Sequence, residues 1–118
     1  MDFEKMDRYL LGKEGATFDY PFDESTRVYR IGRKIFALST EKKPVRINLK
    51  CDPLYALELR SLYEGINAGY HMNKKHWNTV QIEASDVDEE TVRELIDHSY
   101  ALVYKSLTKK EKALLPQS

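Results

Sequence analysis

Hydrophobic and polar residues alternate along much of the first half of the chain. The clearest alternation reads Val45-Arg46-Ile47-Asn48-Leu49-Lys50. A period of two is typical of an antiparallel strand with one buried face, and here the exposed face is polar and basic. Residues 27–31 and 34–38 are predicted as two further strands. Gly32 at the first position of the two-residue loop between them favours a type II′ hairpin.

A second hairpin is predicted later in the chain. Its arms are residues 66–72 and 77–84. In the second arm, Val80, Ile82 and Ala84 are expected on one face because they too alternate with polar residues. The turn between the arms is the polar sequence Asn73-Lys74-Lys75-His76.

The N-terminal segment repeats its apolar residues at helical spacing instead. Phe3, Met6 and Leu10 share one face of the predicted helix. Asp2 precedes this face as an N-terminal cap, and Gly12 follows it where a C-terminal cap is expected.

A middle helix is predicted to begin at Asp52-Pro53, an acidic cap followed by proline at the first helical position, and to end at Gly65. Its apolar side is expected to contain Leu54, Leu57, Leu59 and Leu62. The last third of the chain is also helical in pattern. Asp88 caps a long helix whose buried stripe comprises Val92, Leu95, Ile96, Ser99, Leu102 and Val103. Thr108 and Glu111 form a capping-box pattern that opens a short final helix ending at Pro116.

This order of elements predicts an α+β fold in one domain, residues 1–118. A single antiparallel sheet would pack against helices on one side and remain partly open on the other. The lone Cys51 excludes an internal disulfide framework. Neither a membrane span nor the apolar core of a signal peptide is visible, so we expect a soluble, monomeric, cytoplasmic protein without a cofactor or structural metal.

Charge is balanced overall, with 19 basic and 19 acidic residues, but it is unevenly distributed. Residues 26–50 contain eight basic residues and one acid, whereas residues 1–25 carry three basic and seven acidic residues. Two interpretations stay open for the basic segment. It is either the solvated face of alternating strands or a surface for an anionic partner.

Residues 69–80 are the densest cluster of polar and aromatic side chains, and they allow three interpretations. His71 and His76 could ligate a metal, but no neighbouring acid or cysteine completes the ligand set. A histidine could act as a general base, but no nucleophile, phosphate loop or carboxylate pair accompanies it. The third interpretation is a hairpin tip in which Lys74, Lys75 and Asn73 contact phosphate. Cys51 is either a thiol of lowered pKa beside a helix cap or, preferably, a small buried hydrophobe.

The sequence His71-Met72-Asn73-Lys74-Lys75-His76-Trp77-Asn78-Thr79-Val80 resembles the signature of the MmcQ/YjbR family. Other stretches support the resemblance over nearly the whole chain: Tyr20-Pro21-Phe22, Gly32-Arg33-Lys34-Ile35-Phe36-Ala37, Leu49-Lys50-Cys51-Asp52-Pro53 and Asp97-His98-Ser99-Tyr100.

The resemblance implies a CyaY-like fold and a non-enzymatic, DNA-binding role for two basic hairpin wings. The wings would correspond to residues 27–50 and to the turn at residues 73–76. Phosphates would be contacted with weak sequence preference by Arg30, Arg33, Lys34, Lys42, Lys43, Arg46, Lys50, Lys74 and Lys75. Asn73, His76 and Trp77 would shape the tip of the second wing.

An iron-binding role, known for CyaY itself, is not implied. That role depends on an acidic first helix, whereas here acidic Asp2, Glu4 and Asp7 are mixed with Lys5 and Arg8. The alternative hypothesis is a module that binds a protein or a small anion in a pocket around His71, His76 and Trp77. Converging side chains of His71 and His76 would instead favour a metal site or a histidine-dependent enzyme.

Overall fold

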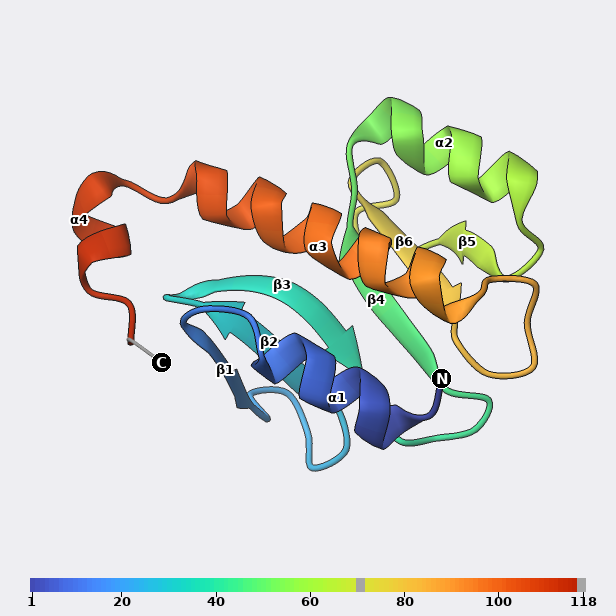
Figure 1. Ribbon diagram of the computed structural model, residues 1–118, viewed down its shortest axis with the longest axis horizontal. Coiled ribbons are helices and arrows are strands. Elements are labelled where there is room, and N and C mark those ends of the chain that lie inside the picture. Colours follow the sequence, from blue (N-terminus) through green and yellow to red (C-terminus); the bar gives the residue numbers. More distant parts are fainter. Residues whose placement is uncertain (70–71, 117–118) are drawn as a thin grey trace.

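A six-stranded antiparallel sheet forms the centre of the molecule, in the order β1-β2-β3-β4-β6-β5 (Figure 1). The structure is a computed structural model that describes residues 1–69 and 72–116. The strands are β1 (Ala16–Asp19), β2 (Arg27–Ile31), β3 (Lys34–Ser39), β4 (Arg46–Lys50), β5 (Ile66–Ala68) and β6 (Trp77–Gln81). The helices are α1 (Phe3–Leu11), α2 (Pro53–Leu62), α3 (Glu89–Ser106) and α4 (Lys109–Ala113). The predicted α+β class with a single antiparallel sheet is therefore confirmed.

Local signals in the sequence explain where these elements begin. The side chains of Asp2, Asp52 and Asp88 each accept a hydrogen bond from a backbone N–H in the first turn of α1, α2 and α3. Such caps satisfy donors that the helix itself leaves unpaired. Thr108 and Glu111 form the predicted capping box of α4. Between β2 and β3, Gly32 adopts a φ of +61°, as the first position of a type II′ turn requires.

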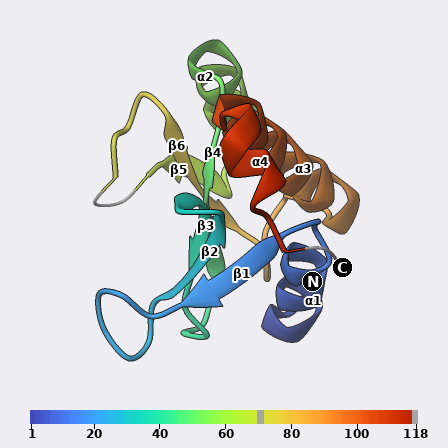
Figure 2. The same cartoon turned by 90° about the vertical axis from the view of Figure 1, so that its left-hand side faces the viewer.

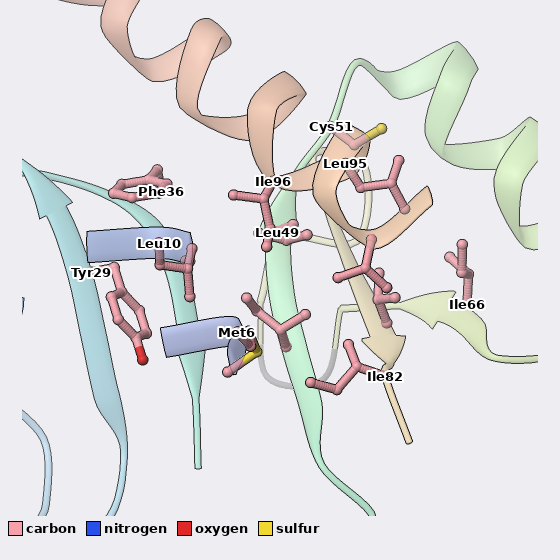
Figure 3. Packing of buried hydrophobic residues seen from close by; sticks show 14 of the residues in the cluster. Met6, Leu10, Tyr29, Phe36, Leu49, Cys51, Ile66, Ile82, Leu95 and Ile96 are labelled. Carbon is pink, nitrogen blue, oxygen red and sulfur yellow. The ribbon is translucent and has the colours of Figure 1, made fainter. Parts of the chain in front are cut away.

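The hydrophobic core lies between the sheet and the helices α1 and α3. Met6 and Leu10 reach it from α1, and Leu95 and Ile96 reach it from α3 (Figure 3). Directly paired strand residues point to the same face of a sheet. Ile47 pairs with Val80, so both side chains enter the core on the inner face.

None of the helices in the described residues covers the other face of the sheet. Figure 2 views the sheet nearly edge-on, with α1 and α3 on one side. The β1–β2 connection and the described part of the β5–β6 connection project on the opposite side. Pairing places Leu38, Asn48 and Thr79 side by side on this outer face, from β3, β4 and β6. We call this surface the open face.

The middle helix differs from its prediction. Leu54, Leu57 and Leu62 point to solvent, and within α2 only Ala56 and Leu59 are buried. The prediction that all four leucines form the packed side was therefore wrong. The helix also ends earlier than Gly65, because Tyr63 adopts an extended backbone conformation, although its N–H still donates to the carbonyl of Leu59.

The second hairpin is present but its strands are shorter than predicted. β5 ends at Ala68 and β6 at Gln81, so Gly69, Met72 and residues 82–84 lie outside the strands, whereas the turn at residues 73–76 is where it was predicted. Residues 70 and 71 lie outside the described part of the chain. Val80 and Ile82 are buried as expected, whereas Ala84 is exposed and has a φ of +49°, so it has left the strand. Among the stripe residues of α3, Leu102 is only half-buried. No helix in the described part of the chain is long and apolar enough to cross a membrane.

Candidate functional site

The open face carries a groove of about 720 Å³ that both projecting connections help to line. Its lining comes from three strands and three connections: Phe22, Asp23, Thr26, Leu38, Ser39, Thr40, Lys42, Lys43, Pro44, Arg46, Asn48, Met72 and Thr79. A volume of this size is in the range of small-molecule sites, roughly 300–1,000 Å³. We call it the open-face groove.

The floor of the groove combines one apolar and two polar side chains. Leu38 is only 6% exposed and pairs with Asn48, which in turn pairs with Thr79. The Thr79 hydroxyl donates to Oδ1 of Asn48 at 2.5 Å. Since this bond occupies the amide oxygen, the NH₂ group is what Asn48 can offer to a ligand.

Cations surround one end of the groove. Lys42, Lys43 and Arg46 are all exposed, and they come from the β3–β4 connection and the first residue of β4. The Lys43 ammonium lies 3.9 Å from Glu83, but it is so exposed that this contact contributes little attraction. Arg46 makes only a long bond, 3.5 Å, to the carbonyl of Pro44. These three charges are therefore available to an anion in solution.

Asp23, the acidic residue in the groove lining, accepts hydrogen bonds from residues of its own loop. Asp23 accepts hydrogen bonds from the backbone N–H groups of Ser25 and Thr26, at 2.8 and 2.6 Å, and from both hydroxyls. The backbone bond from Thr26 contributes most to holding the pKa of Asp23 below its ordinary value. The carboxylate therefore orders the β1–β2 connection through donors of its own loop, and none of the ion pairs among the described residues joins it to Lys42, Lys43 or Arg46.

The turn between β5 and β6 presents two further lysines. Oδ1 of Asn73 accepts from the N–H of Lys75 at 2.9 Å, and its carbonyl accepts from His76 and Trp77. The carbonyl of His76 accepts from Cys51 at 2.7 Å, which ties the turn to the end of β4. Lys74 and Lys75 themselves are exposed. The Asn-Lys-Lys-His-Trp sequence thus specifies the turn as well as supplying charge.

Arg60 of α2 hydrogen-bonds to this turn and to the start of β6, a role that was not predicted from the sequence. Its Nε donates to Oδ1 of buried Asn78 at 2.6 Å, and its guanidinium also reaches the carbonyls of Trp77 and Lys74. The only sequence signal is its position four residues after Ala56, on the packed side of the helix. That signal was obscured by the leucines on the other side.

Three of the predicted phosphate contacts lie away from the groove. Arg30 forms an ion pair with Asp19 at 3.0 Å and donates to the carbonyl of Arg33. The Lys34 ammonium donates to Ser106 at the end of α3, at 3.0 and 3.1 Å. Arg33 is exposed at the β2–β3 turn, next to α4. The predicted basic set is therefore not one continuous patch.

The remaining predicted residues lie around the β5–β6 hairpin. Trp77 is half-buried and pairs with Lys50 on the open face. A Cβ on Gly69 would lie 2.8 Å from the Cβ of Trp77, which is too close for any residue other than glycine. His76 is half-buried, whereas His71 lies outside the described residues, and the hypothesis of a pocket or site around both stays a prediction. Within residues 1–69 and 72–116, no three potential metal ligands cluster.

Two other candidates have structural roles. Burial raises the pKa of the Cys51 thiol to about 11, and neighbouring Asp52 adds to the effect, so a thiol of lowered pKa is excluded. Nε2 of His98 accepts the N–H of Asp52 at 3.1 Å, where α2 begins. Burial lowers the pKa of His98, so it is neutral and able to accept at neutral pH.

The stretch Asp97-His98-Ser99-Tyr100 joins α3 by hydrogen bonds to α1 and to the segment that follows α1. Asp97 accepts from the Tyr9 hydroxyl at 2.7 Å, and the Tyr100 hydroxyl donates to the carbonyl of Glu14 at 2.6 Å. The resemblance in this stretch therefore reflects requirements of the fold.

Comparisons with known proteins agree with this architecture. The model of the YjbR family matches residues 11–102. Protein YbdF of Escherichia coli is 43% identical over 93 residues, covering 78% of this chain and 75% of YbdF. YjbR of Escherichia coli is 28% identical, with 99% of both chains covered.

Two solved structures share the fold over most of the chain. A crystal structure from Deinococcus radiodurans superposes with a TM-score of 0.88 at 34% identity, covering 99% of this chain and 91% of the other. A crystal structure from Pseudomonas syringae gives 0.76 at 27% identity, covering 87% and 99%. The arrangement of sheet and helices is therefore shared with these bacterial proteins.

Proposed function

This chain belongs to the YjbR family, and from that premise we propose that it is a non-enzymatic, cytoplasmic DNA-binding protein. It would hold the phosphate backbone against the open face with weak sequence preference. The two wings that the resemblance implies would be residues 27–50, which form β2, β3 and β4 with their connections, and residues 73–76 of the β5–β6 turn.

One observation supports the proposal most directly. Apart from Arg33, which is exposed at the β2–β3 turn, the predicted basic residues whose side chains make no close hydrogen bond or ion pair in the described part of the protein come from β4, the connection before it and the β5–β6 turn: Lys42, Lys43, Arg46, Lys50, Lys74 and Lys75. These segments border the open face, while Asp19 and Asp23 nearby are engaged by Arg30 and by backbone donors. A neutral protein can in this way offer a local cationic surface to phosphates.

Fluorescence anisotropy with a labelled duplex of about 20 base pairs tests the proposal through its salt dependence. Six phosphate contacts predict a slope of log affinity against log salt of about −5. The double variant Lys42→Ala/Lys43→Ala should reduce the steepness by about 2, since each contact contributes about 0.9. Its matched control is Lys109→Ala/Lys110→Ala, which removes the same charge from exposed positions on α4.

The measurement has outcomes that would contradict the proposal. A slope near zero means that no counterions are released and that phosphates are not bound. Equal losses in the two double variants mean that net charge, and not the open face, determines binding. The labelled single strand, titrated in parallel, shows whether the surface prefers paired or unpaired DNA.

A further inference from the structure

We infer that the open-face groove binds a small organic anion with an apolar body, of the class of aromatic carboxylates and phosphate monoesters. The inference shares Lys42, Lys43 and Arg46 with the proposed function, but it also concerns the groove's apolar surface, which phosphate contacts would not use. It follows from three properties: apolar residues in the lining, polar groups that donate, and a volume suited to a small molecule.

The apolar surface is assembled from separate segments. Phe22 comes from the β1–β2 connection, Leu38 from β3, Pro44 from the β3–β4 connection, and Met72 from the β5–β6 connection. Phe22 is 66% exposed, although a phenyl ring is less favourable in water than in an apolar environment. A planar apolar group seated in the groove would cover part of this ring.

The polar groups that remain available in the groove are donors. Lys42, Lys43 and Arg46 are cations, and Asn48 has its amide NH₂ left to offer. Asp23, the carboxylate in the groove lining, accepts hydrogen bonds from its own loop. The Ser39 hydroxyl donates to the carbonyl of Arg46 at 2.6 Å. A ligand that complements this set carries oxygen acceptors and negative charge.

The size of the groove favours an organic molecule over an inorganic ion. A volume of about 720 Å³ is far larger than phosphate alone would fill. The apolar residues and the cations also lie in one lining, so one molecule can contact both. An anionic group would meet Arg46 and the two lysines while the apolar body lies over Leu38 and beside Phe22.

Anilinonaphthalene sulfonate is a suitable probe, because it joins an aromatic body to one anionic group and fluoresces when bound. We expect saturable binding by the folded protein and displacement by phenyl phosphate. The variant Arg46→Gln should weaken the dye about fivefold, as loss of one partly solvated charge contact predicts. Arg33→Gln is the matched control, since it removes an exposed arginine from the distant β2–β3 turn.

The uncharged analogue N-phenylnaphthylamine separates the apolar contribution from the ionic one. Phe22→Ser should weaken both dyes, whereas Arg46→Gln should weaken only the sulfonate. Circular dichroism melting of every variant is required, because partly folded chains also bind the sulfonate dye. If Arg46→Gln and Arg33→Gln have equal effects, or if both dyes bind equally to Arg46→Gln and to the unmodified protein, the inference is overturned.

The same variants distinguish this inference from the proposed function. Lys74→Ala/Lys75→Ala removes charge from the β5–β6 turn, which does not line the groove. This pair should weaken DNA binding and leave the dye affinity unchanged. Dye binding that persists without DNA binding overturns only the proposed function. DNA binding without saturable dye binding overturns only the groove.

Discussion

The hydroxyl of Ser99 joins α3 to two strands at a fully buried point. It accepts from the N–H of Lys50 at 2.9 Å and donates to the carbonyl of Phe36 at 2.6 Å. Both backbone groups would otherwise be buried without a partner. One small side chain therefore fixes the position of the long helix over β3 and β4.

Ser99→Ala should lower the free energy of unfolding by about 2–3 kcal/mol, because it leaves a donor and an acceptor unsatisfied. Urea denaturation followed by circular dichroism measures the change. Ser61→Ala is the control, since Ser61 also bonds to a carbonyl, that of Glu58, but lies exposed on α2. Equal effects of the two substitutions would show that the bridge at Ser99 does not stabilise the fold.

Cys51 makes the free energy of unfolding depend on pH in the alkaline range. Burial raises the pKa of its thiol from 9.0 to about 11, so the unfolded chain loses this proton at lower pH than the folded protein. The contribution of the protonated Cys51 thiol to the free energy of unfolding is fully present below pH 9 and is lost as pH rises toward about 11. The free energy of unfolding should therefore fall more steeply across this interval in the unmodified protein than in Cys51→Ala.

Urea denaturation at several pH values tests this difference. The pKa of buried Tyr29 is also raised, chiefly by burial, but Tyr29 is present in both proteins and its contribution cancels. Parallel pH profiles for the two proteins would contradict the assignment.

The α2 helix has leucines on both its packed and its solvent-facing sides. Leu59 is buried, whereas Leu57 is 59% exposed. Leu59→Ala should cost about 2–5 kcal/mol of stability, because it removes buried methyl groups and leaves a cavity. Leu57→Ala should change stability by less than about 0.5 kcal/mol. Similar losses in urea denaturation would mean that Leu57 is covered in solution.

Elements with local signals could be predicted from the sequence, and α2 shows where such signals fail. The caps at Asp2 and Asp88 act within one turn, and the alternation in β4 needs only its own residues. In α2, leucines at 54, 57 and 62 outweigh Ala56 and Leu59 in hydrophobicity, yet packing against β5 decides which side is buried. Periodicity alone contains no information about that neighbour.

The candidate site could be predicted only as a set of single side chains. The cations at Lys42, Lys43 and Arg46 were identified, but the groove beside them was not, because its lining comes from three strands and three connections. Arg30 and Lys34 were identified as available, yet each has a partner in a distant segment. Such pairings depend on tertiary structure, and local charge counting cannot reveal them.

Local unfolding should occur more readily in some elements than in others, since the residues of β4 are far more buried than those of α4. β4 is hydrogen-bonded on both sides, to β3 and β6, and its Ile47 and Leu49 are in the core. The five residues of α4 include none that is buried. Amide hydrogen exchange followed by NMR should give the slowest rates in β4, set by global unfolding, and the fastest helical rates in α4. Comparable protection in α4 would contradict this expectation.

The strand order has a consequence for how the protein is made. β6 lies between β4 and β5, although it follows both in the sequence, and α3 covers the sheet only from residue 89 onward. A ribosome releases the chain from its N-terminus, so α1 and β1 to β4 emerge while β4 still lacks its neighbour β6, and Ile47 and Leu49 still lack α3 above them. Strands with an exposed apolar face and an unpaired edge are prone to aggregation. The sheet therefore becomes complete late in translation, and a pause before α3 emerges would prolong the interval in which chaperones are needed.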